Sequence, residues 1–549
     1  MGQLNVNEIQ QLGIKQGGDV VEVLGVWVGK NQEKCNNLNW EKKISSISTV
    51  LSLWKRRYLS LYGRLTVVSS LLMSKLWYTL AVQTIPPKYY LQIKKLCIDF
   101  LWDYKSHLVS YETIIAKKSE GGLHFPDIML KMFSFRLKFL GRLLNPDYTA
   151  VWKDICVYFF SKVKNMNLGL EILVCELVPK CVANLPFFCR EMLLAWIKIR
   201  KFVEFDINEK NIYEMPLFYN PNIKNDGNML YFKPFVEAGI NKLMHLTYEV
   251  VPGFLKMDAI YEILSEIESE ITYKEVVNNY KKILTSMPYE WINWINENIN
   301  PPGKSNSLVN ENMTSSIDNK QIPIPQDTRT FYNLLLKLVQ KSPIAESFWT
   351  NIYPDIEFTK CYIYANLHFL PSECKELNFK ITHKVLFTKQ HLLKCNMSND
   401  DTCPSCKITT ESIDHLFNNC PDLSRFHDFL KDLLLNLLRY ADNSYVNKLD
   451  FKSLILFGFM KKSKGFNFYF ANFVLNIARY CIYKRRNFLS MNSAAKLDLI
   501  EYFKTILNQK VSYNFYIYIM RKERQLLEKY FISENPILKI VSNKPEILY

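Results

Sequence analysis

Apolar residues recur at helical spacing along most of this chain. Between Trp40 and Arg142, two successive runs of apolar residues step by three or four positions, as expected for amphipathic helices that bury one face. The first run is Trp40, Ile44, Ile47, Leu51 and Trp54, and the second is Leu61, Leu65, Val68, Leu72 and Leu76. The pattern predicts two helices, then a third that starts at Pro86-Pro87 and a fourth that carries Arg142.

The residues before Leu38 show a different pattern. Residues 20–29 are rich in β-branched side chains and lie between Gly17-Gly18 and Gly29, which predicts one or two β-strands. A strand needs neighbours, and the nearby sequence supplies no other sheet. We therefore expect the remnant of a sheet at this end.

The formal net charge of +16 is placed unevenly. Residues 38–142 hold 17 Lys and Arg against 6 Asp and Glu, and residues 479–524 hold 10 against 3. These blocks, at +11 and +7, exceed the total, so the rest of the chain is close to neutral at −2. This clustering of Lys and Arg indicates two surfaces that face a nucleic acid, because an excess of positive charge that served only solubility would be spread evenly along the chain. For the second block, the solubilising interpretation stays open.

Both basic blocks interleave cations with aromatic rings. The helix junction Trp54-Lys55-Arg56-Arg57-Tyr58 suits a phosphate backbone better than a protein partner. In the second block, Lys484-Arg485-Arg486 follows an apolar helix face, and the tyrosine-rich residues 513–518 precede Arg521-Lys522. A solvated helix end has a similar pattern. The predicted nucleic-acid contacts are Lys55, Arg56, Arg57, Arg64, Lys75, Lys484, Arg485 and Arg486.

The sharpest chemical signal is a set of four residues of metal-ligand type. Cys403, Cys406, His415 and Cys420 have the spacing Cys-x2-Cys-x8-His-x4-Cys. Two thiolates on a tight turn bind one side of a zinc ion, and a His and a Cys about one helical turn apart supply the other corners of a tetrahedron. Four protein ligands leave no open position, so we expect structural Zn²⁺ and not catalytic zinc. Unligated buried thiols are the alternative.

Several other motifs are better explained by structural roles. His391 and Cys395 lie just upstream as alternative ligands, although core or surface roles are expected for both, and His383 is expected to be a packed or capping histidine. Tyr440-Ala441-Asp442-Asn443 resembles a polymerase metal box but ends in Asn and follows a helical run. Gly303-Lys304-Ser305 lacks the upstream glycine of a phosphate-binding loop, so nucleotide hydrolysis is not supported.

The glycine pair Gly121-Gly122 precedes a helix. Two glycines would let the backbone approach a phosphate, but a plain turn ahead of the helix is the expected role.

Composition limits the compartment. The 13 Cys are mostly expected to be buried thiols of a reducing compartment. No apolar run approaches the ~18 residues of a membrane span, and no apolar signal-peptide region follows Met1. We expect a soluble, intracellular protein, cytoplasmic and/or nuclear, with no membrane partner.

These patterns together predict a mainly α fold. With 17 Gly and 48% hydrophobic residues in 549, packed helices dominate, so we expect a multi-domain helical array with a short N-terminal β remnant and a small zinc-binding module. The predicted segments are a strand remnant at 1–37, a basic helical domain at 38–150, a helical connector at 151–298, a linker at 299–328, a zinc-binding domain at 329–430 and a helical basic region at 431–549.

A resemblance to a known family rests on the order of short motifs. They are Leu24-Gly25-Val26-Trp27-Val28-Gly29, Asn39-Trp40, Leu53-Trp54-Lys55-Arg56-Arg57, Leu61-Tyr62-Gly63-Arg64, Ser74-Lys75-Leu76-Trp77-Tyr78, Phe100-Leu101-Trp102, Glu120-Gly121-Gly122-Leu123 and Pro126-Asp127. In this order, residues 20–150 resemble the LINE-type (non-LTR) retrotransposon reverse transcriptases. The resemblance implies that this run is the last palm strand followed by the helical thumb.

The cysteine-bearing segment has a second resemblance to the same family. It is similar to the zinc-binding segment found C-terminal to non-LTR reverse transcriptases. The matching residues are Phe379-Lys380-Ile381-Thr382-His383, Leu393, Cys403-Pro404-Ser405-Cys406, Glu411-Ser412-Ile413-Asp414-His415-Leu416-Phe417 and Cys420-Pro421. Both halves thus point to one family, in the order that the family shows.

The resemblance implies binding without catalysis. In the family, whose activity is RNA-directed DNA polymerisation, the metal-binding aspartates precede the thumb, and Asp19 is the only aspartate before it here. We therefore expect no catalytic residues, a role in gripping RNA and/or DNA, and the rest of a retrotransposon polyprotein as a partner. Two alternatives stay open: a polymerase whose palm comes from another chain, and a domesticated zinc-dependent interaction protein.

Overall fold

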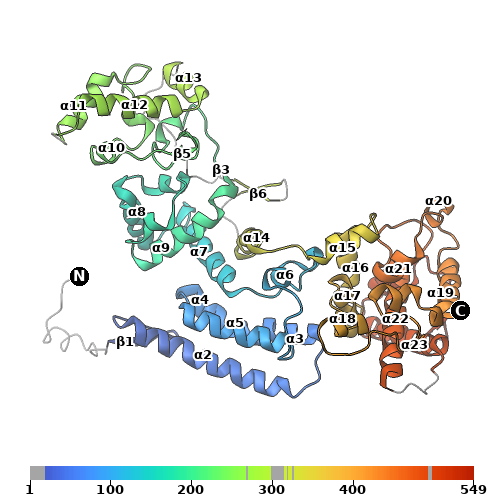
Figure 1. Ribbon diagram of the computed structural model, residues 1–549. Helices are drawn as coiled ribbons and strands as arrows, with labels where there is room; N and C mark the ends of the chain where they lie inside the picture. Colours follow the sequence, from blue (N-terminus) through green and yellow to red (C-terminus); the bar gives the residue numbers. More distant parts are fainter. Residues whose placement is uncertain are drawn as a thin grey trace. The chain divides into compact units, whose positions relative to one another are not determined.

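The computed structural model describes residues 19–267, 270–297, 309, 314–317, 320–323, 327–491 and 497–549. Helices make up most of these residues, with a few short strands, so the predicted mainly α fold is confirmed (Figure 1). Gly17-Gly18, Gly303-Lys304-Ser305 and most of the predicted linker 299–328 lie outside the described residues.

The chain packs into two compact units. Unit 1 comprises the chain up to residue 76, residues 85–126 and residues 340–549, and unit 2 comprises residues 77–84 and 127–339. Unit 1 is thus assembled from stretches far apart in sequence, with most of unit 2 lying between them along the chain. The predicted division into six segments stays a prediction.

Unit 1 holds the longest helices. Its helices are α2 (Gln32–Lys55), α3 (Leu61–Val67), α5 (Pro87–Leu101), α6 (Tyr111–Ile115), α15 (Ala345–Ile352), α16 (Phe358–Ala365), α17 (Ser372–Thr382), α18 (Lys389–Lys394), α19 (Ser424–Leu437), α20 (Asn443–Val446), α21 (Phe451–Phe457), α22 (Phe468–Met491), α23 (Leu499–Met520) and α24 (Arg524–Leu527). Helix α4 (Ser74–Val82) crosses the boundary between the units. Two antiparallel hairpins, β1 (Val20–Val23) with β2 (Val26–Gly29) and β8 (Leu538–Val541) with β9 (Lys544–Ile547), complete unit 1.

Unit 2 is also helical. Its helices are α7 (Ile128–Leu144), α8 (Val151–Ser161), α9 (Phe187–Ile199), α10 (Lys233–Glu237), α11 (Met257–Ser265), α12 (Tyr273–Ser286), α13 (Tyr289–Glu297) and α14 (Thr328–Val339). Its short strands are β3 (Val203–Glu204), β4 (Lys224–Asn225), β5 (Asn228–Met229), β6 (Thr314–Ile317) and β7 (Lys320–Pro323), with β6 between β3 and β7 in one sheet.

The Arg136 side chain on α7 is buried and donates to the Ala81 carbonyl at 2.7 Å, so this cation of the first basic block is structural.

The predicted N-terminal strands form a hairpin that is tied to α2. Leu24 and Gly25 in its turn have φ of 49° and 78°, as the tight turn between twisted antiparallel strands requires. The Asn39 side chain on α2 both accepts from the Trp27 N–H (2.8 Å) and donates to the Trp27 carbonyl (2.7 Å). The hairpin is thus fixed to the first long helix.

Both apolar runs of the first basic block are buried, apart from Trp54 of the first run, which is half-buried. The second run extends over α3, a π-helical turn at Val68–Leu72 and α4, not over one continuous helix. Met73 N–H donates to the Val68 carbonyl at 3.0 Å, five residues back, which widens the turn. The widened turn keeps Val68, Leu72 and Leu76 buried while the helix bends.

Within unit 1, α3 packs against α17, which is some three hundred residues later in the chain. The Leu61 N–H donates to Glu376 Oε2 at 2.8 Å, and the Tyr62 hydroxyl donates to Asn366 Oδ1 at 2.5 Å. Burial raises the pKa of Tyr62, so the phenol stays a donor. The N-terminal helices and the C-terminal segment are therefore in direct contact within unit 1.

The turn at Gly121-Gly122 is packed and not open to a ligand. Gly121 has φ of +81°, and a Cβ there would lie 2.5 Å from Pro343 Cγ. The Gly121 carbonyl lies 2.7 Å from His383 Nε2, and His383 is buried at the end of α17. These contacts confirm both the plain turn and the packed, capping histidine.

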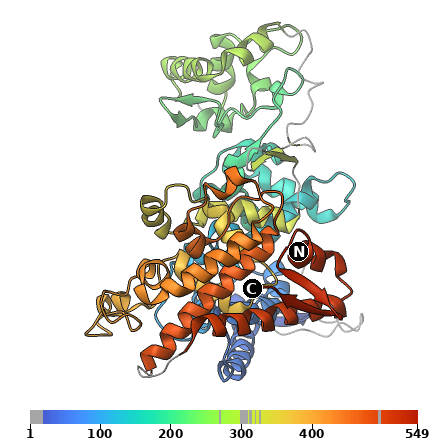
Figure 2. The same ribbon diagram turned by 90° about the vertical axis from the view of Figure 1, so that its right-hand side faces the viewer.

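Helix α22 is the centre of the unit 1 core. Most of its first fifteen residues are buried, and α23 packs along it (Figure 2).

Among the described helices, no single one is long and apolar enough to span a membrane. Residues 61–72 and 74–82 meet the length and composition of a span only when taken together, and they are bent by 43°.

We expect the buried His383 to make unit 1 pH-sensitive. Burial lowers the pKa of His383 to about 4, from an ordinary value of 6.5. Between these values the unfolded chain binds a proton that the folded chain does not, so the stability from neutral His383 is present above pH 6.5 and lost as pH falls toward 4. As the pH falls through this range, the free energy of unfolding of the wild type should decrease by up to about 1.4 kcal/mol more per pH unit than that of the His383→Gln variant.

Denaturant unfolding of both proteins across this range measures the difference. Any loss of metal at low pH affects both proteins alike, so parallel curves would contradict the assignment.

Candidate metal centre and basic surface

Cys403 and Cys406 lie in a tight loop within unit 1. The Cys403 N–H donates to the Thr409 carbonyl at 2.8 Å, and the Lys407 N–H donates to the Cys403 carbonyl at 2.9 Å. Lys407 has φ of 57°, which lets the chain reverse between the two strands of this loop. The loop therefore holds the two sulfur atoms on one side, as the Cys-x2-Cys spacing predicts.

His415 and Cys420 come from the next turn of the chain. His415 begins a π-helical turn, His415–Asn419, and Cys420 follows directly at its end. The His415 N–H donates to Ser412 Oγ at 3.0 Å, which fixes the start of this turn. Cys403, His415 and Cys420 are buried, and Cys406 is half-buried.

The four ligand atoms have the spacing of a tetrahedral zinc site. They all lie within 4.8 Å of one another. Cys403 Sγ lies 3.9 Å from Cys420 Sγ, and Cys406 Sγ lies 3.5 Å from His415 Nε2. Zn–S bonds of about 2.3 Å and Zn–N bonds of about 2.05 Å give tetrahedral edges of about 3.8 Å and about 3.6 Å. The geometry thus fits a structural Zn²⁺ held by all four residues.

Hydrogen bonding favours the thiolate at one ligand of the pair Cys403 and Cys420, while the same contact raises the pKa of Cys420. The contact with Cys420 lowers the pKa of Cys403, and the backbone amides of Cys406 and Ser405 lower it further. Thr409 Oγ1 lies 3.1 Å from His415 Nδ1, which suits a tautomer that donates from Nδ1 and leaves Nε2 free to bind metal. No sequence signal pointed to Thr409, because many residue types supply such a partner.

The two alternative ligands lie outside this cluster. Among the described residues, the metal-binding grouping contains Cys403, Cys406, His415 and Cys420 alone. Cys395 is exposed, and His391 packs edge-on against Phe387.

A buried ion pair joins the metal segment to α22. Arg486 donates from Nε to Glu411 Oε1 at 2.7 Å and from its terminal nitrogen to Oε2 at 2.5 Å. Glu411 is fully buried, and its Oε2 also accepts the Lys389 N–H at 2.6 Å. Arg485 pairs with Asp422 at 2.7 Å, just after Cys420. These two arginines therefore hold the metal segment at its middle, between Cys406 and His415, and just after its last ligand.

Three of the cations predicted to contact nucleic acid are engaged within the protein. Arg486 is buried, and Arg485 is engaged with Asp422, so neither presents a free guanidinium to phosphate. Arg64 donates to the carbonyls of Leu101 (2.8 Å) and Leu59 (2.7 Å) and is mostly buried. Sequence reasoning missed this because surface and buried arginines look alike in a local pattern.

The junction after α2 is exposed. Lys55, Arg56, Arg57 and Tyr58 are all exposed, and the first three form no salt bridge with a described residue. Lys55 Nζ lies 4.2 Å from the ring centroid of Tyr104, and Arg57 Cζ lies 4.8 Å from that of Trp54. These stacked cations keep their charge available to a polyanion.

A second group of cations surrounds Lys75. Lys43 Nζ donates to the Lys75 carbonyl at 3.1 Å. Burial lowers the pKa of Lys43, and the neighbouring charges of Lys42 and Lys75 lower it further. Lys42 and Lys43 were not singled out from the sequence, although both lie in the basic block.

Comparison with known proteins links the chain to a transposon. No protein-family model matches it. It is similar to the Transposon TX1 uncharacterized 149 kDa protein of Xenopus laevis, at 21% identity over 456 residues. The match covers 78% of this chain but 34% of the relative, so the chain spans about a third of the relative's length. The chain is therefore related to a transposon-encoded protein.

We expect the purified chain to contain about one zinc ion, and a Cys403→Ser, Cys406→Ser variant to lose it. Removing two of four ligands abolishes the tetrahedral set, and elemental analysis after exhaustive desalting measures the content. Cys395→Ser removes an exposed thiol outside the cluster and should keep the zinc. Equal zinc contents in the two variants would exclude this site.

We expect Arg486→Ala to lower the free energy of unfolding by about 3–5 kcal/mol, because it leaves the Glu411 carboxylate buried without its partner. Lys484→Ala removes an exposed cation from the same helix and should change the free energy of unfolding by less than about 0.5 kcal/mol. Guanidinium unfolding with zinc present measures both. Equal effects would contradict the structural role of Arg486.

Proposed function

We propose that this chain is a nucleic-acid-binding C-terminal region of a non-LTR retrotransposon reverse transcriptase polyprotein. The similarity to a transposon protein supports the retrotransposon origin. The two motif series of that family, in order on one chain, support the assignment to the thumb and the zinc-binding segment.

One observation carries the binding role: the exposed cations Lys55, Arg56 and Arg57 have no salt-bridge partner among the described residues. Unpaired cations beside aromatic rings attract a phosphate backbone through release of its counterions. Lys75, with Lys42 and Lys43 beside it, adds a second cationic surface. Lys484 is exposed and belongs to the proposed interface, whereas Arg64, Arg485 and Arg486 do not.

The metal segment supports this role structurally. Four protein ligands complete the coordination of zinc, so the ion holds the loop and offers no site to a substrate. RNA and/or DNA are the proposed partners, together with the rest of the polyprotein, inside the cell. Binding, and not catalysis, is the activity we assign to this chain.

We expect binding to nucleic acid to weaken steeply between about 50 and 200 mM salt. Replacing Lys55, Arg56 and Arg57 by Ala should make the slope of log affinity against log salt shallower by about 2, because each lost phosphate contact removes about 0.7–0.9. Filter binding across a salt series measures the slope. The matched control replaces Lys274, Lys281 and Lys282 by Ala, which removes the same charge elsewhere. Identical slopes for both variants would contradict the proposed surface.

A further inference from the structure

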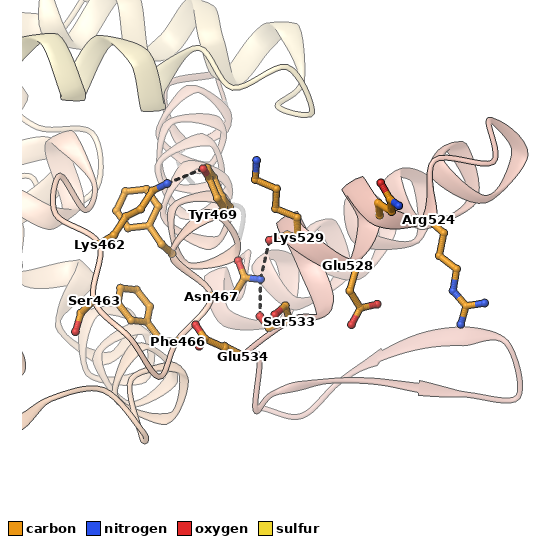
Figure 3. A pocket seen from close by; sticks show the side chains of 12 residues that line it. Lys462, Ser463, Phe466, Asn467, Tyr469, Arg524, Glu528, Lys529, Ser533 and Glu534 are labelled. Atoms are coloured by element: carbon orange, nitrogen blue, oxygen red, sulfur yellow. Dashed lines mark hydrogen bonds between the residues drawn. The ribbon is translucent and has the colours of Figure 1, made fainter.

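Two cavities lie close together in the C-terminal part of unit 1. The first, of 630 Å³, lies beside the start of α22 and helix α24, and its lining includes Lys462, Tyr469, Arg524 and Lys529. Figure 3 shows Lys462 directed at Tyr469, with Lys529 beside the same ring. Lys462 Nζ lies 2.8 Å from the Tyr469 hydroxyl. Cationic side chains thus gather over an aromatic ring in this cavity.

The second cavity, of 370 Å³, is lined by α23 and by the chain that leads into α17. Its lining includes His368, Lys510, Tyr513, Tyr518 and Arg521. Tyr513 is 64% exposed, so most of its ring is free to contact another molecule. This cavity also combines cations with an accessible aromatic ring.

A row of aromatic rings connects the two cavities. His368 Nε2 lies 2.7 Å from the Tyr518 hydroxyl, and the His368 ring centroid lies 5.0 Å from that of Tyr530. The Tyr530 centroid in turn lies 4.9 Å from that of Tyr469 in the first cavity. A chain of ring contacts through Tyr530 thus links the two cavities, and we call these four rings the aromatic row: Tyr518, His368, Tyr530 and Tyr469.

The cations along this row lack carboxylate partners. Lys375, Lys462, Lys510, Arg521, Arg524 and Lys529 form no salt bridge with any described residue. Glu373, Glu528 and Glu534 also line the cavities, so the surface is cationic but not uniformly so. Lys375 does not line either cavity, but its Nζ donates to the backbone carbonyl of His368 at 3.3 Å, which places its charge beside the row.

The environment of Lys375 favours an anion. Burial lowers the pKa of Lys375 to about 8, and the nearby charge of Lys118 lowers it further. A bound phosphate would relieve this repulsion and restore the protonated form. Burial also lowers the pKa of His368, so its ring is neutral at pH 7 and packs as an aromatic group.

We propose that the paired cavities bind a single-stranded polynucleotide, with bases against Tyr513 and the accessible rings of the row, His368, Tyr469 and Tyr530, and phosphates at the cations in and beside the cavities; Tyr518 is buried and supports the row from behind. The inference rests on the proposed function and gives it a second site, separate from Lys55, Arg56 and Arg57. Unpaired bases have free faces for stacking on tyrosine, whereas a duplex offers its stacked bases only at its ends. Concave cavities lined by rings therefore select single strands over duplex.

The test compares variants of the full-length, zinc-loaded chain. The probes are a fluorescein-labelled oligouridylate of about twelve nucleotides and a duplex of the same length, at low salt. Lys462→Ala with Lys529→Ala, and Lys375→Ala with Lys510→Ala, should each raise the dissociation constant for the single strand about tenfold and leave that for the duplex within about twofold.

A further test variant, Tyr513→Ala, is compared with two matched controls. Tyr513→Ala should weaken single-strand binding about fivefold or more, because base–tyrosine stacking is lost. Tyr516→Ala removes a ring that is 45% exposed on the same helix but does not line the cavity, and it should have no effect. Lys274→Ala with Lys281→Ala controls for the loss of two charges. Thermal unfolding confirms that each variant is folded.

The outcomes separate the two proposals. If the wild-type chain binds neither probe at low salt, the proposed function and this inference both fail. If it binds both probes but the cavity variants behave like their controls, this inference is overturned while the proposed function stands.

Discussion

The ion pair between Glu411 and Arg486 fixes the metal-binding segment to the helical core. Both side chains are buried, and a charge pair is tolerable there only when its hydrogen bonds are complete. Completion comes from two bonds to Arg486 and one to the Lys389 N–H. Because Glu411 lies between Cys406 and His415 in sequence, holding it restricts where the ligands can lie before any ion binds.

Much of the helical fold was predictable from local sequence. The apolar runs in the first basic block identified the residues that are buried, because a helix that packs on one side must repeat at three or four positions. The π-helical turn at Val68–Leu72 was not predictable, since it keeps the same apolar spacing and changes only the backbone bonding. The assembly of unit 1 from distant stretches was also hidden, because it depends on contacts such as Leu61 with Glu376.

The candidate metal ligands were fully visible in the sequence, and the basic surface only in part. Four Cys and His residues at this spacing predict a tetrahedral ligand set, and the structure brings all four together. The position of a lysine or arginine in the sequence does not show whether its side chain is exposed or paired inside the protein. Lys484 and Arg486 stand two positions apart in one motif, yet one is exposed and the other pairs with a glutamate seventy-five residues away.

The packing of Gly121 against Pro343 and His383 joins residues that are synthesised far apart in time. A ribosome adding about 5–20 residues per second needs on the order of tens of seconds to pass from one to the other. Helices α2 and α3 therefore emerge long before α17, and all of unit 2 has been translated by the time α17 emerges. Unit 1 thus reaches its native state only after residues 340–549 have been translated, and until then the apolar faces of its early helices lack their final packing partners.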